Sequence, residues 1–287
     1  MPKVTKQIVG SSTKASNGKT GSVIDRITPI YFNKDLGIRV VLYGQSGTGK
    51  TTTWATFPGP ILAMICSGGN QPGELLSINT PEYAGKVSQV VIENSSDVFE
   101  LIKHIKDTGR FKTVVLDHAT GLQDLVLKEI LGMEEIPVQK TWGMARQQDY
   151  GTCTIRTKEI LRALFGIQGN IVVIAQEREF KSEEGLASEL IAPYVGANLM
   201  PNLAGWLNSA ADYICQTFKR PKEKLVKHTV AGKEVTRREV TREVEYCLRT
   251  AADPVYMTKF RVPKGKPLPN VIVDPDYDKI VKIIRGG

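Results

Sequence analysis

The sequence lacks any apolar run long enough to cross a bilayer, so we expect no membrane-spanning helix. Residues 1–22 carry four lysines and no apolar core, so we also expect no export signal. The four cysteines, Cys66, Cys153, Cys215 and Cys247, lie far apart without a CxxC pair, which disfavours both a zinc site and a disulfide framework. These absences predict a cytoplasmic protein with reduced thiols and no membrane partner.

Positive charge is concentrated in two segments of the chain. The net charge is +8; residues 1–22 contain no acidic residue, and residues 217–266 contain 14 lysines and arginines against six acidic residues. Proteins that bind nucleic acid often carry such basic appendages on a nearly neutral core. The interspersed charges of residues 233–246 (KEVTRREVTREVEY) are equally typical of a solvated hairpin, so both interpretations stay open.

Short apolar runs alternate with helical patterns in the first two thirds of the chain. Strands are predicted at residues 38–44, 61–65, 87–92, 113–117 and 171–176. Helices are predicted at residues 50–56, 97–109, 121–132 and about 145–165, the second of them with Asp97 as N-cap and Glu100 three residues later. This alternation predicts an α/β fold with a mostly parallel twisted sheet covered by helices on both faces.

The two ends of the chain follow different patterns. Residues 1–36 are predicted to be a flexible basic arm with a short docking strand at 23–30, and residues 37–287 to be the folded core. Strand-like segments without intervening helices in the tail, about residues 211–287, predict an antiparallel extension of the sheet. Residues 177–202 are predicted to be a long irregular loop, and loops of this length inside a compact domain are usually functional or mobile.

One motif carries most of the chemistry. Residues 44–51 (GQSGTGKT) match the P-loop pattern GxxxxGK[ST] in full, after a predicted strand and before a predicted helix. The glycines allow backbone N–H groups to converge on phosphate oxygens, Lys50 can reach the β- and γ-phosphates, and the Thr51 hydroxyl can ligate Mg²⁺. The sequence therefore predicts an ATP and Mg²⁺ site at Gly44, Gln45, Ser46, Gly47, Thr48, Gly49, Lys50, Thr51 and Thr52.

Two polar residues follow neighbouring predicted strands. Asp117 ends the strand TVVLD and is the expected carboxylate for Mg²⁺. Gln176 follows IVVIA and either contacts the γ-phosphate or merely ends the strand. No Asn/Thr-Lys-x-Asp box is present, which mildly favours ATP over GTP.

The order of these parts resembles the RecA-like P-loop ATPases, and more narrowly the phage RecA-fold ATPases of single-strand annealing and recombination. The resemblance rests on YGQSGTGKTT, TFPGP, TVVLD, TWGMARQQDYG, IVVIAQE and DPVYMTKFRVPKG, and it spans about residues 37–284. It implies ATP bound between subunits of a ring or filament, in a phage- or bacterium-type protein. It also implies that Lys259 and Arg261 reach the γ-phosphate of a neighbouring subunit, and that residues 177–202 face DNA.

One departure from the resemblance concerns hydrolysis. RecA-like hydrolases usually carry a water-activating glutamate after the second strand, where this chain has Cys66 and Ser67. Glu74 and His118 are possible substitutes. We therefore predict ATP binding, with hydrolysis that is slow or dependent on assembly and DNA.

The leading functional hypothesis is an ATP-dependent protein that binds single-stranded DNA in recombination or annealing. Phe218, Tyr246, Tyr256 and Phe260 could stack on bases, although aromatic residues in strands are more often core residues. The alternatives are a ring-type helicase or packaging ATPase, a P-loop kinase-like enzyme, and a non-hydrolysing nucleotide switch.

Overall fold

The computed structural model describes residues 37–66, 75–132, 145–180, 194–230 and 233–286. The side chains of residues 227–235 are also left undescribed. The described residues belong to one compact unit that begins at Leu36. The predicted arm of residues 1–36, with its docking strand at 23–30, lies outside the described part.

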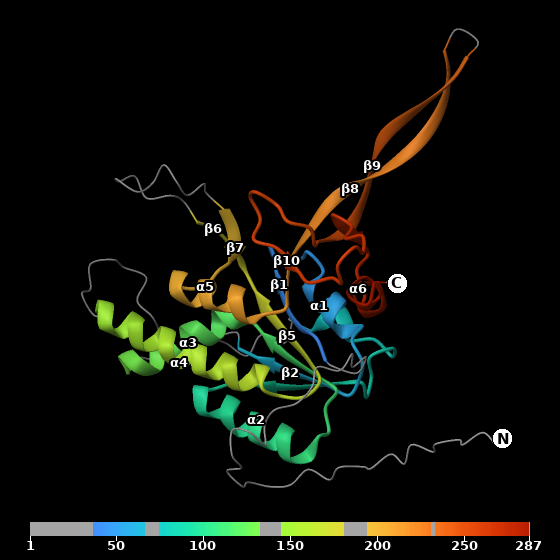
Figure 1. Cartoon of the computed structure of the whole chain (residues 1–287). Coiled ribbons are helices and arrows are strands. Elements are labelled where there is room, and N and C mark those ends of the chain that lie inside the picture. The colour runs from blue at the N-terminus through green and yellow to red at the C-terminus, as the bar shows by residue number, and fades with distance from the viewer. Residues whose placement is uncertain (1–36, 67–74, 133–144, 181–193, 231–232, 287) are drawn as a thin grey trace, which may run out of the picture. The chain divides into compact units, whose positions relative to one another are not determined.

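Nine strands form one sheet in the described part of the chain (Figure 1). Five come from the first two thirds of the chain: β1 (Arg39–Tyr43), β2 (Ile61–Ile65), β3 (Val87–Val91), β4 (Thr113–Asp117) and β5 (Asn170–Ala175). Four come from the tail: β8 (Tyr213–Val230), β9 (Lys233–Arg249), β10 (Lys259–Phe260) and β11 (Val271–Val273). The order across the sheet is β11-β9-β8-β1-β5-β4-β2-β3, and β10 also pairs with β8.

The sheet topology places the sequence motifs at one edge. β1 pairs in parallel with β5 on one side and with β8 on the other, and β5 separates β1 from β4. The carboxyl ends of parallel strands meet at the same edge of a sheet, which is where open α/β folds bind ligands. Residues 44–51, Asp117 and Gln176 therefore converge there, because they follow or end β1, β4 and β5.

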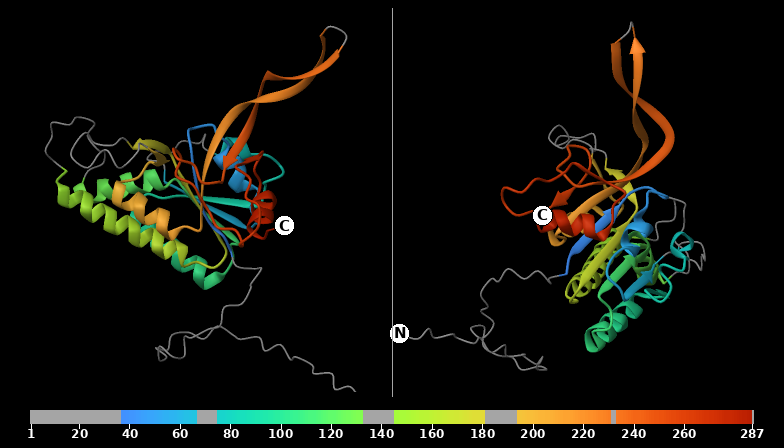
Figure 2. Two further views of the ribbon diagram at one scale, coloured as in Figure 1. Left: turned by 45° about the horizontal axis from the view of Figure 1, so that its top comes forward. Right: turned by 90° about the vertical axis from the view of Figure 1, so that its right-hand side faces the viewer.

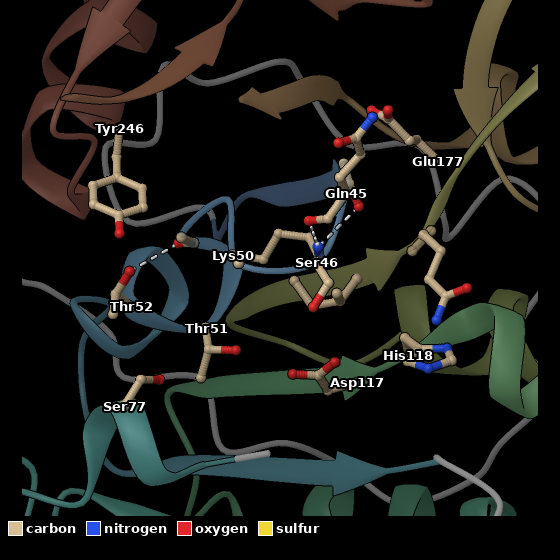
Figure 3. A pocket seen from close by; sticks show the side chains of 16 residues that line it. Gln45, Ser46, Lys50, Thr51, Thr52, Ser77, Asp117, His118, Glu177 and Tyr246 are labelled. Atoms are coloured by element: carbon tan, nitrogen blue, oxygen red, sulfur yellow. Dashed lines mark hydrogen bonds between the residues drawn. The ribbon is translucent and has the colours of Figure 1, made fainter. Parts of the chain in front are cut away.

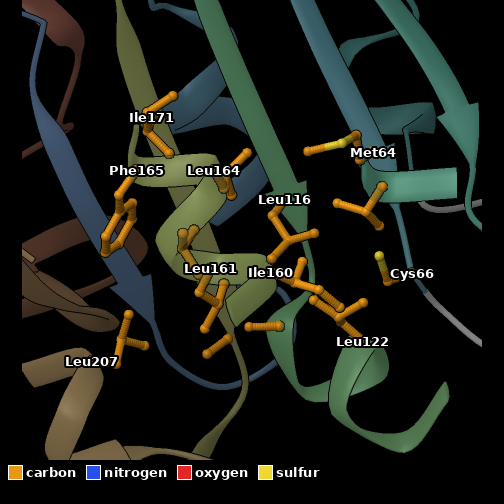
Figure 4. Close-up of a cluster of buried hydrophobic side chains, with 14 of the residues drawn as sticks. Met64, Cys66, Leu116, Leu122, Ile160, Leu161, Leu164, Phe165, Ile171 and Leu207 are labelled. Carbon is orange, nitrogen blue, oxygen red and sulfur yellow. The ribbon is translucent and has the colours of Figure 1, made fainter. Parts of the chain in front are cut away.

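Helices cover both faces of the sheet. They are α1 (Lys50–Ala55), α2 (Ser95–Thr108), α3 (Ala119–Leu131), α4 (Gln147–Phe165), α5 (Pro201–Ala210) and α6 (Tyr277–Ile284). The helices α2, α3, α4 and α5 share one apolar cluster with the sheet (Figure 4), whereas α1 and α6 pack on the opposite face. Successive residues of β1 alternate between the two clusters, since neighbouring side chains of a strand point to opposite faces. The predicted α/β fold, with a mostly parallel sheet covered by helices and an antiparallel extension, is confirmed.

The start of α2 differs from the prediction. Its N-cap is Asn94, whose side chain accepts a hydrogen bond from the Asp97 N–H at 3.1 Å, and Asp97 closes a reciprocal capping box at the N3 position. Either residue can cap a helix, and the sequence pattern pointed to the wrong one. The predicted end at Gly109 is confirmed, because Gly109 adopts the left-handed conformation of a C-cap (φ 59°).

Residues 177–202 are more regular than the predicted irregular loop. Residues 177–180 form β6 (Glu177–Phe180), which pairs antiparallel with β7 (Tyr194–Ala197), and residues 181–193 lie outside the described part. The helix α5 then starts at Pro201 and was not predicted. The prediction failed because two short strands interrupted by a long segment give no continuous periodicity.

The tail forms a long two-stranded ribbon attached to the sheet. β8 continues past its parallel pairing with β1 and pairs antiparallel with β9 along almost its whole length. Figure 2 shows this ribbon extending beyond the helices and the other strands. We call β8 and β9 together the tail hairpin. Beyond the tail hairpin, the tail forms only the short strands β10 and β11 among the described residues, and the helix α6 that follows them was not predicted.

Candidate nucleotide site

A cavity of about 790 Å³ opens above the carboxyl ends of β1, β4 and β5 (Figure 3). Its volume falls within the range of ligand sites in proteins. The residues that line it are Gly44, Gln45, Ser46, Gly47, Gly49, Lys50, Thr51, Thr52, Ser77, Asp117, His118, Ile174, Ala175, Gln176, Glu177 and Tyr246. Every predicted cofactor-binding residue except Thr48 therefore lines one cavity.

The backbone of the P-loop has the conformation that phosphate binding requires. Gly47 (φ 70°) and Gly49 (φ 88°) adopt left-handed conformations that favour glycine. Gly49 is the N-cap of α1 and has no side chain to satisfy the N–H groups of the first turn. Those N–H groups remain available to an anion, and the helix dipole adds partial positive charge at the same point.

Lys50 lies folded against the loop that precedes it. Its Nζ donates hydrogen bonds to the carbonyl oxygens of Gly44 at 2.9 Å and Gln45 at 2.7 Å (Figure 3). Burial lowers the pKa of Lys50 below the ordinary lysine value, while the negative charges of Asp117 and Glu177 oppose that change. A phosphate oxygen could replace either carbonyl as the acceptor with little rearrangement of the chain.

Thr48 has a different place from the rest of the motif. Its side chain is buried, and its Oγ1 donates to the Gln45 carbonyl at 2.7 Å and lies 2.7 Å from the Thr217 Oγ1 on β8. Thr217 in turn donates to the Tyr43 carbonyl at 3.3 Å. The Thr48 side chain thus fastens the P-loop to β8 and does not line the cavity, which leaves only its backbone N–H for a ligand.

Asp117 and Thr51 form a donor set suited to a divalent cation. Figure 3 shows the Thr51 hydroxyl and the Asp117 carboxylate facing the same space. Oxygen ligands of this kind fit Mg²⁺, which keeps several waters and binds few protein groups. The indole N–H of Trp54, a fully buried residue of α1, donates to the Asp117 Oδ2 at 3.3 Å and orients that carboxylate.

Gln176 joins the cavity to the β6–β7 pair. Its side chain lines the cavity, and its backbone carbonyl accepts a hydrogen bond from the Asn198 N–H at 2.7 Å. Asn198 directly follows β7, so the position of Gln176 is tied to the strand that returns from residues 181–193. Whether Gln176 contacts a γ-phosphate stays a prediction.

Lys259 and Arg261 do not reach the cavity of their own chain. β10 pairs with the first residues of β8, at the opposite end of the ladder from the P-loop. The Lys259 Nζ donates hydrogen bonds to three carbonyl oxygens at the end of α5, and the shortest of these bonds is 2.8 Å, to the Ala211 carbonyl. Arg261 forms an ion pair with Asp212 at 2.6 Å. Their role toward a neighbouring subunit stays a prediction.

The aromatic residues of the tail have separate roles. The Arg249 guanidinium contacts the rings of Phe218 and Tyr256, at 4.9 Å and 4.4 Å from their centroids. The ring of Phe260 packs against Tyr213 in the apolar core. Of the aromatic residues Phe218, Tyr246, Tyr256 and Phe260, Tyr246 alone lines the cavity. Its ring lies close to the P-loop, since a methyl group placed on Gly49 would lie 3.2 Å from it.

The residues that the sequence analysis considered in connection with water activation differ in their outcome. Cys66 follows β2 but is buried, and its backbone N–H donates to the Asp117 carbonyl at 2.7 Å. Ser67 and Glu74 lie outside the described part of the chain. His118 lines the cavity, and its Nδ1 accepts a hydrogen bond from the Gly121 N–H at 2.8 Å as the N-cap of α3.

Sequence reasoning missed several residues of the site. Ser77 and Tyr246 line the cavity from distant segments; nothing in the sequence indicates Ser77, and the sequence suggests Tyr246 only as a residue that could stack on bases. Trp54 and Thr217 act from beneath it, through the hydrogen bonds to Asp117 and Thr48. Glu177 directly follows Gln176 and could have been found, since it stands at the same strand end.

No helix in the described residues is long and apolar enough to span a membrane.

Comparisons with known proteins identify the family of the chain. No curated protein matches the chain. Among solved structures, the flagellar accessory protein FlaH from Methanocaldococcus jannaschii is similar at 9% identity with a TM-score of 0.40, covering 84% of this chain and 86% of that one. The family model described as "AAA domain" matches residues 36–262, so the chain belongs to the AAA domain family of P-loop ATPases.

Proposed function

We propose that this chain is an ATP-binding, RecA-like ATPase that acts on single-stranded DNA in recombination or strand annealing, with ATP held at subunit interfaces. The observation that carries the proposal is the basic tail hairpin, whose base contributes Tyr246 to the nucleotide cavity. A segment that touches both the nucleotide and a polyanion can make binding of one depend on the other.

The charges of the tail hairpin favour a polyanionic partner. Three of its acidic side chains, Glu223, Glu243 and Glu245, are already engaged in ion pairs with basic neighbours on the ribbon. Arg237 and Arg242 are exposed and form no ion pair or hydrogen bond with the described residues, whereas the Lys219 Nζ lies beside the P-loop, 3.7 Å from where a methyl group on Gly47 would stand. Unpaired cations on an extended ribbon suit phosphate contacts with little sequence preference.

The cation content of the cavity favours assembly. Lys50 is the only lysine or arginine among the described residues that line it. Phosphoryl transfer commonly uses a second cation to stabilise charge on the transferring group. A neighbouring subunit could supply that cation, and Lys259 and Arg261 stay candidates for it in a ring or filament.

The first test measures ATP turnover with and without single-stranded DNA, across protein concentration, for wild type and Lys50→Ala. We expect turnover that rises with DNA and with concentration, and that vanishes in the variant. Turnover that ignores DNA but rises with a small phosphate acceptor would contradict the proposal and favour a kinase-like enzyme. Unwinding or translocation of duplex DNA would favour a helicase or packaging ATPase.

A second test separates the tail hairpin from general charge effects. We expect the double variant Arg237→Gln/Arg242→Gln to weaken single-strand binding and to reduce the salt slope of log affinity by about 1.4, since each phosphate contact contributes about 0.7. The matched control is Lys103→Gln/Lys106→Gln on the exposed side of α2, which removes the same charge elsewhere. Equal losses in both doubles would contradict a role of the tail hairpin in DNA binding.

A non-hydrolysing nucleotide switch is a second candidate, favoured by the absence of an acidic residue directly after β2, where Cys66 is buried. Lys50-dependent ATP binding without turnover under any of these conditions would support the switch.

A further inference from the structure

The P-loop N–H groups and Lys50 can bind the phosphates, and Thr51 with Asp117 can bind the cation. None of these residues has the role of activating water. Hydrolysis of ATP requires a residue that orients the attacking water and accepts its proton. Among the described residues that line the cavity, the only carboxylates are Asp117 and Glu177. Asp117 faces the Thr51 hydroxyl and is suited to the cation, which leaves Glu177 without an assigned role.

We propose that Glu177 is the water-activating residue of this ATPase. It directly follows Gln176 and begins β6, at the carboxyl end of β5. The backbone of Glu177 follows β5, which lies between β1 and β4, and its carboxylate reaches past the end of β1 to Gln216 on β8. Figure 3 shows it at the rim of the cavity, on the side of Gln45.

A chain of hydrogen bonds holds the Glu177 carboxylate in place. Its Oε2 accepts from the Gln216 Nε2 at 3.2 Å, and the Gln216 Oε1 accepts from the Arg249 Nε at 3.0 Å. Gln216 is buried, and Arg249 is fixed by its ion pair with Asp253 at 2.8 Å. One carboxylate oxygen is thereby anchored, and the other, Oε1, accepts no hydrogen bond from the described residues and remains open to a water.

The electrostatic surroundings agree with this placement. Burial lowers the pKa of Lys50, and the negative charges of Asp117 and, to a smaller extent, Glu177 oppose that change. Lys50 in turn is the residue expected to reach the γ-phosphate. Glu177 therefore contributes to the charge balance around the lysine of the phosphate site.

His118 is the remaining candidate in the cavity, and its hydrogen bonding argues against it. Its Nδ1 accepts the Gly121 N–H, so the neutral ring carries its proton on Nε2. That nitrogen can donate a hydrogen bond to a phosphate oxygen but cannot accept a proton from water. His118 therefore caps α3 and does not serve as the base.

The reaction balances with ATP and water alone. Glu177 takes one proton from water as the water oxygen forms a bond to the γ-phosphorus. The bond between that phosphorus and the β,γ-bridging oxygen breaks, and its electron pair stays on ADP, where Lys50 offsets the charge. The proton on Glu177 then passes to solvent, which leaves ADP, inorganic phosphate and the original carboxylate.

The test compares Glu177→Gln with wild type by ATP affinity and by phosphate release at saturating ATP. We expect the variant to bind ATP within about threefold of wild type and to lose turnover by about 10²- to 10⁴-fold, the usual contribution of a positioned base. The matched control is Glu179→Gln, an exposed residue of the same strand, which should change neither quantity by more than about twofold.

Two further variants exclude a merely structural role. Glu177→Asp keeps a carboxylate on a shorter stem and should retain ATP binding with intermediate turnover. Gln216→Leu should lower turnover alone but cause no further loss when combined with Glu177→Gln, because it acts through that carboxylate. Loss of ATP binding in both Glu177 variants would show a structural role and overturn the proposal.

Other outcomes also overturn the assignment. Wild-type turnover in Glu177→Gln would do so, as would a wild-type protein that binds ATP but never hydrolyses it. The inference rests on the ATPase part of the proposed function and not on its DNA partner. Turnover that depends on Glu177 but is not stimulated by single-stranded DNA would keep this inference and reject the recombination role.

Discussion

The attachment of the P-loop to β8 through Thr217 gives the sharpest quantitative prediction. Thr217→Val replaces a hydroxyl by a methyl group of nearly the same shape at a buried position. It removes the 2.7 Å contact with the Thr48 Oγ1 and the 3.3 Å bond to the Tyr43 carbonyl. Thr48 keeps its bond to the Gln45 carbonyl, so no hydroxyl proton is left unsatisfied.

The expected cost is about 1–2 kcal/mol, the net value of one good and one weak buried hydrogen bond. For a chain of this length that cost lowers Tm by roughly 2–6 °C. A nucleotide binds the loop only in its ordered conformation, so we expect a loosened loop to weaken ATP binding by about the same free energy. That corresponds to an increase of about 5- to 30-fold in the Kd for ATP.

Calorimetric titration with ATP and thermal unfolding of the same samples measure both quantities. Thr217→Ser is the control, because it keeps the hydroxyl and should hold ATP affinity within about threefold of wild type. The reasoning is refuted if Thr217→Val lowers Tm but binds ATP like wild type, since the P-loop would then be ordered without β8. It is equally refuted if the serine variant binds ATP as weakly as the valine variant.

Three other predictions concern the site and the scaffold. Trp54→Phe removes the hydrogen bond to Asp117 and should raise the Mg²⁺ concentration needed for tight ATP binding by about 10-fold or more. A titration of Mg²⁺ at fixed ATP measures this, and an unchanged Mg²⁺ requirement would contradict the positioning role of Trp54. As pH rises, ATP affinity should begin to fall before pH 10.5 is reached, because burial lowers the pKa of Lys50 below that value and the lysine loses its charge at the lowered pKa. ATP binding by Lys50→Ala should show no such decline. A methyl group on Gly151 in α4 would meet no atom within 4 Å, so Gly151→Ala should raise the free energy of unfolding by about 0.5–1 kcal/mol, measured with a denaturant. A lower free energy of unfolding in the variant would indicate a packing role for Gly151.

The sequence was most informative where chemistry restricts residue type. A phosphate cradle needs glycines at fixed spacing and a lysine at one position, so residues 44–51 could be assigned from the sequence alone. The parallel strands could be predicted for a similar reason, because strands buried on both faces are almost continuously apolar. The segments TVVLD at residues 113–117 and IVVIA at residues 171–175 are the clearest examples.

The rest of the site depends on contacts that span the chain. Tyr246 reaches the cavity only because β9 pairs with β8, and β8 pairs with β1, so its place follows from two strand registers that no local pattern encodes. Trp54 reads in the sequence as an ordinary apolar residue of a short helix, and its hydrogen bond to Asp117 arises from the packing of α1 over β4. The β6–β7 pair was missed because its strands are short and separated by residues 181–193.

The interruption in the tail hairpin has a consequence for how this protein can diversify. The pairing register of β8 and β9 shifts between Pro221 and Glu223, beyond the pair formed by Lys219 and Tyr246. Such an irregularity separates the ribbon into an inner part, which pairs with β1 and carries Tyr246 into the nucleotide cavity, and an outer part, which lies beyond the shift. The outer ribbon can therefore gain, lose or exchange residues while the inner part keeps its geometry, so that one ATPase core can carry tips adapted to different partners.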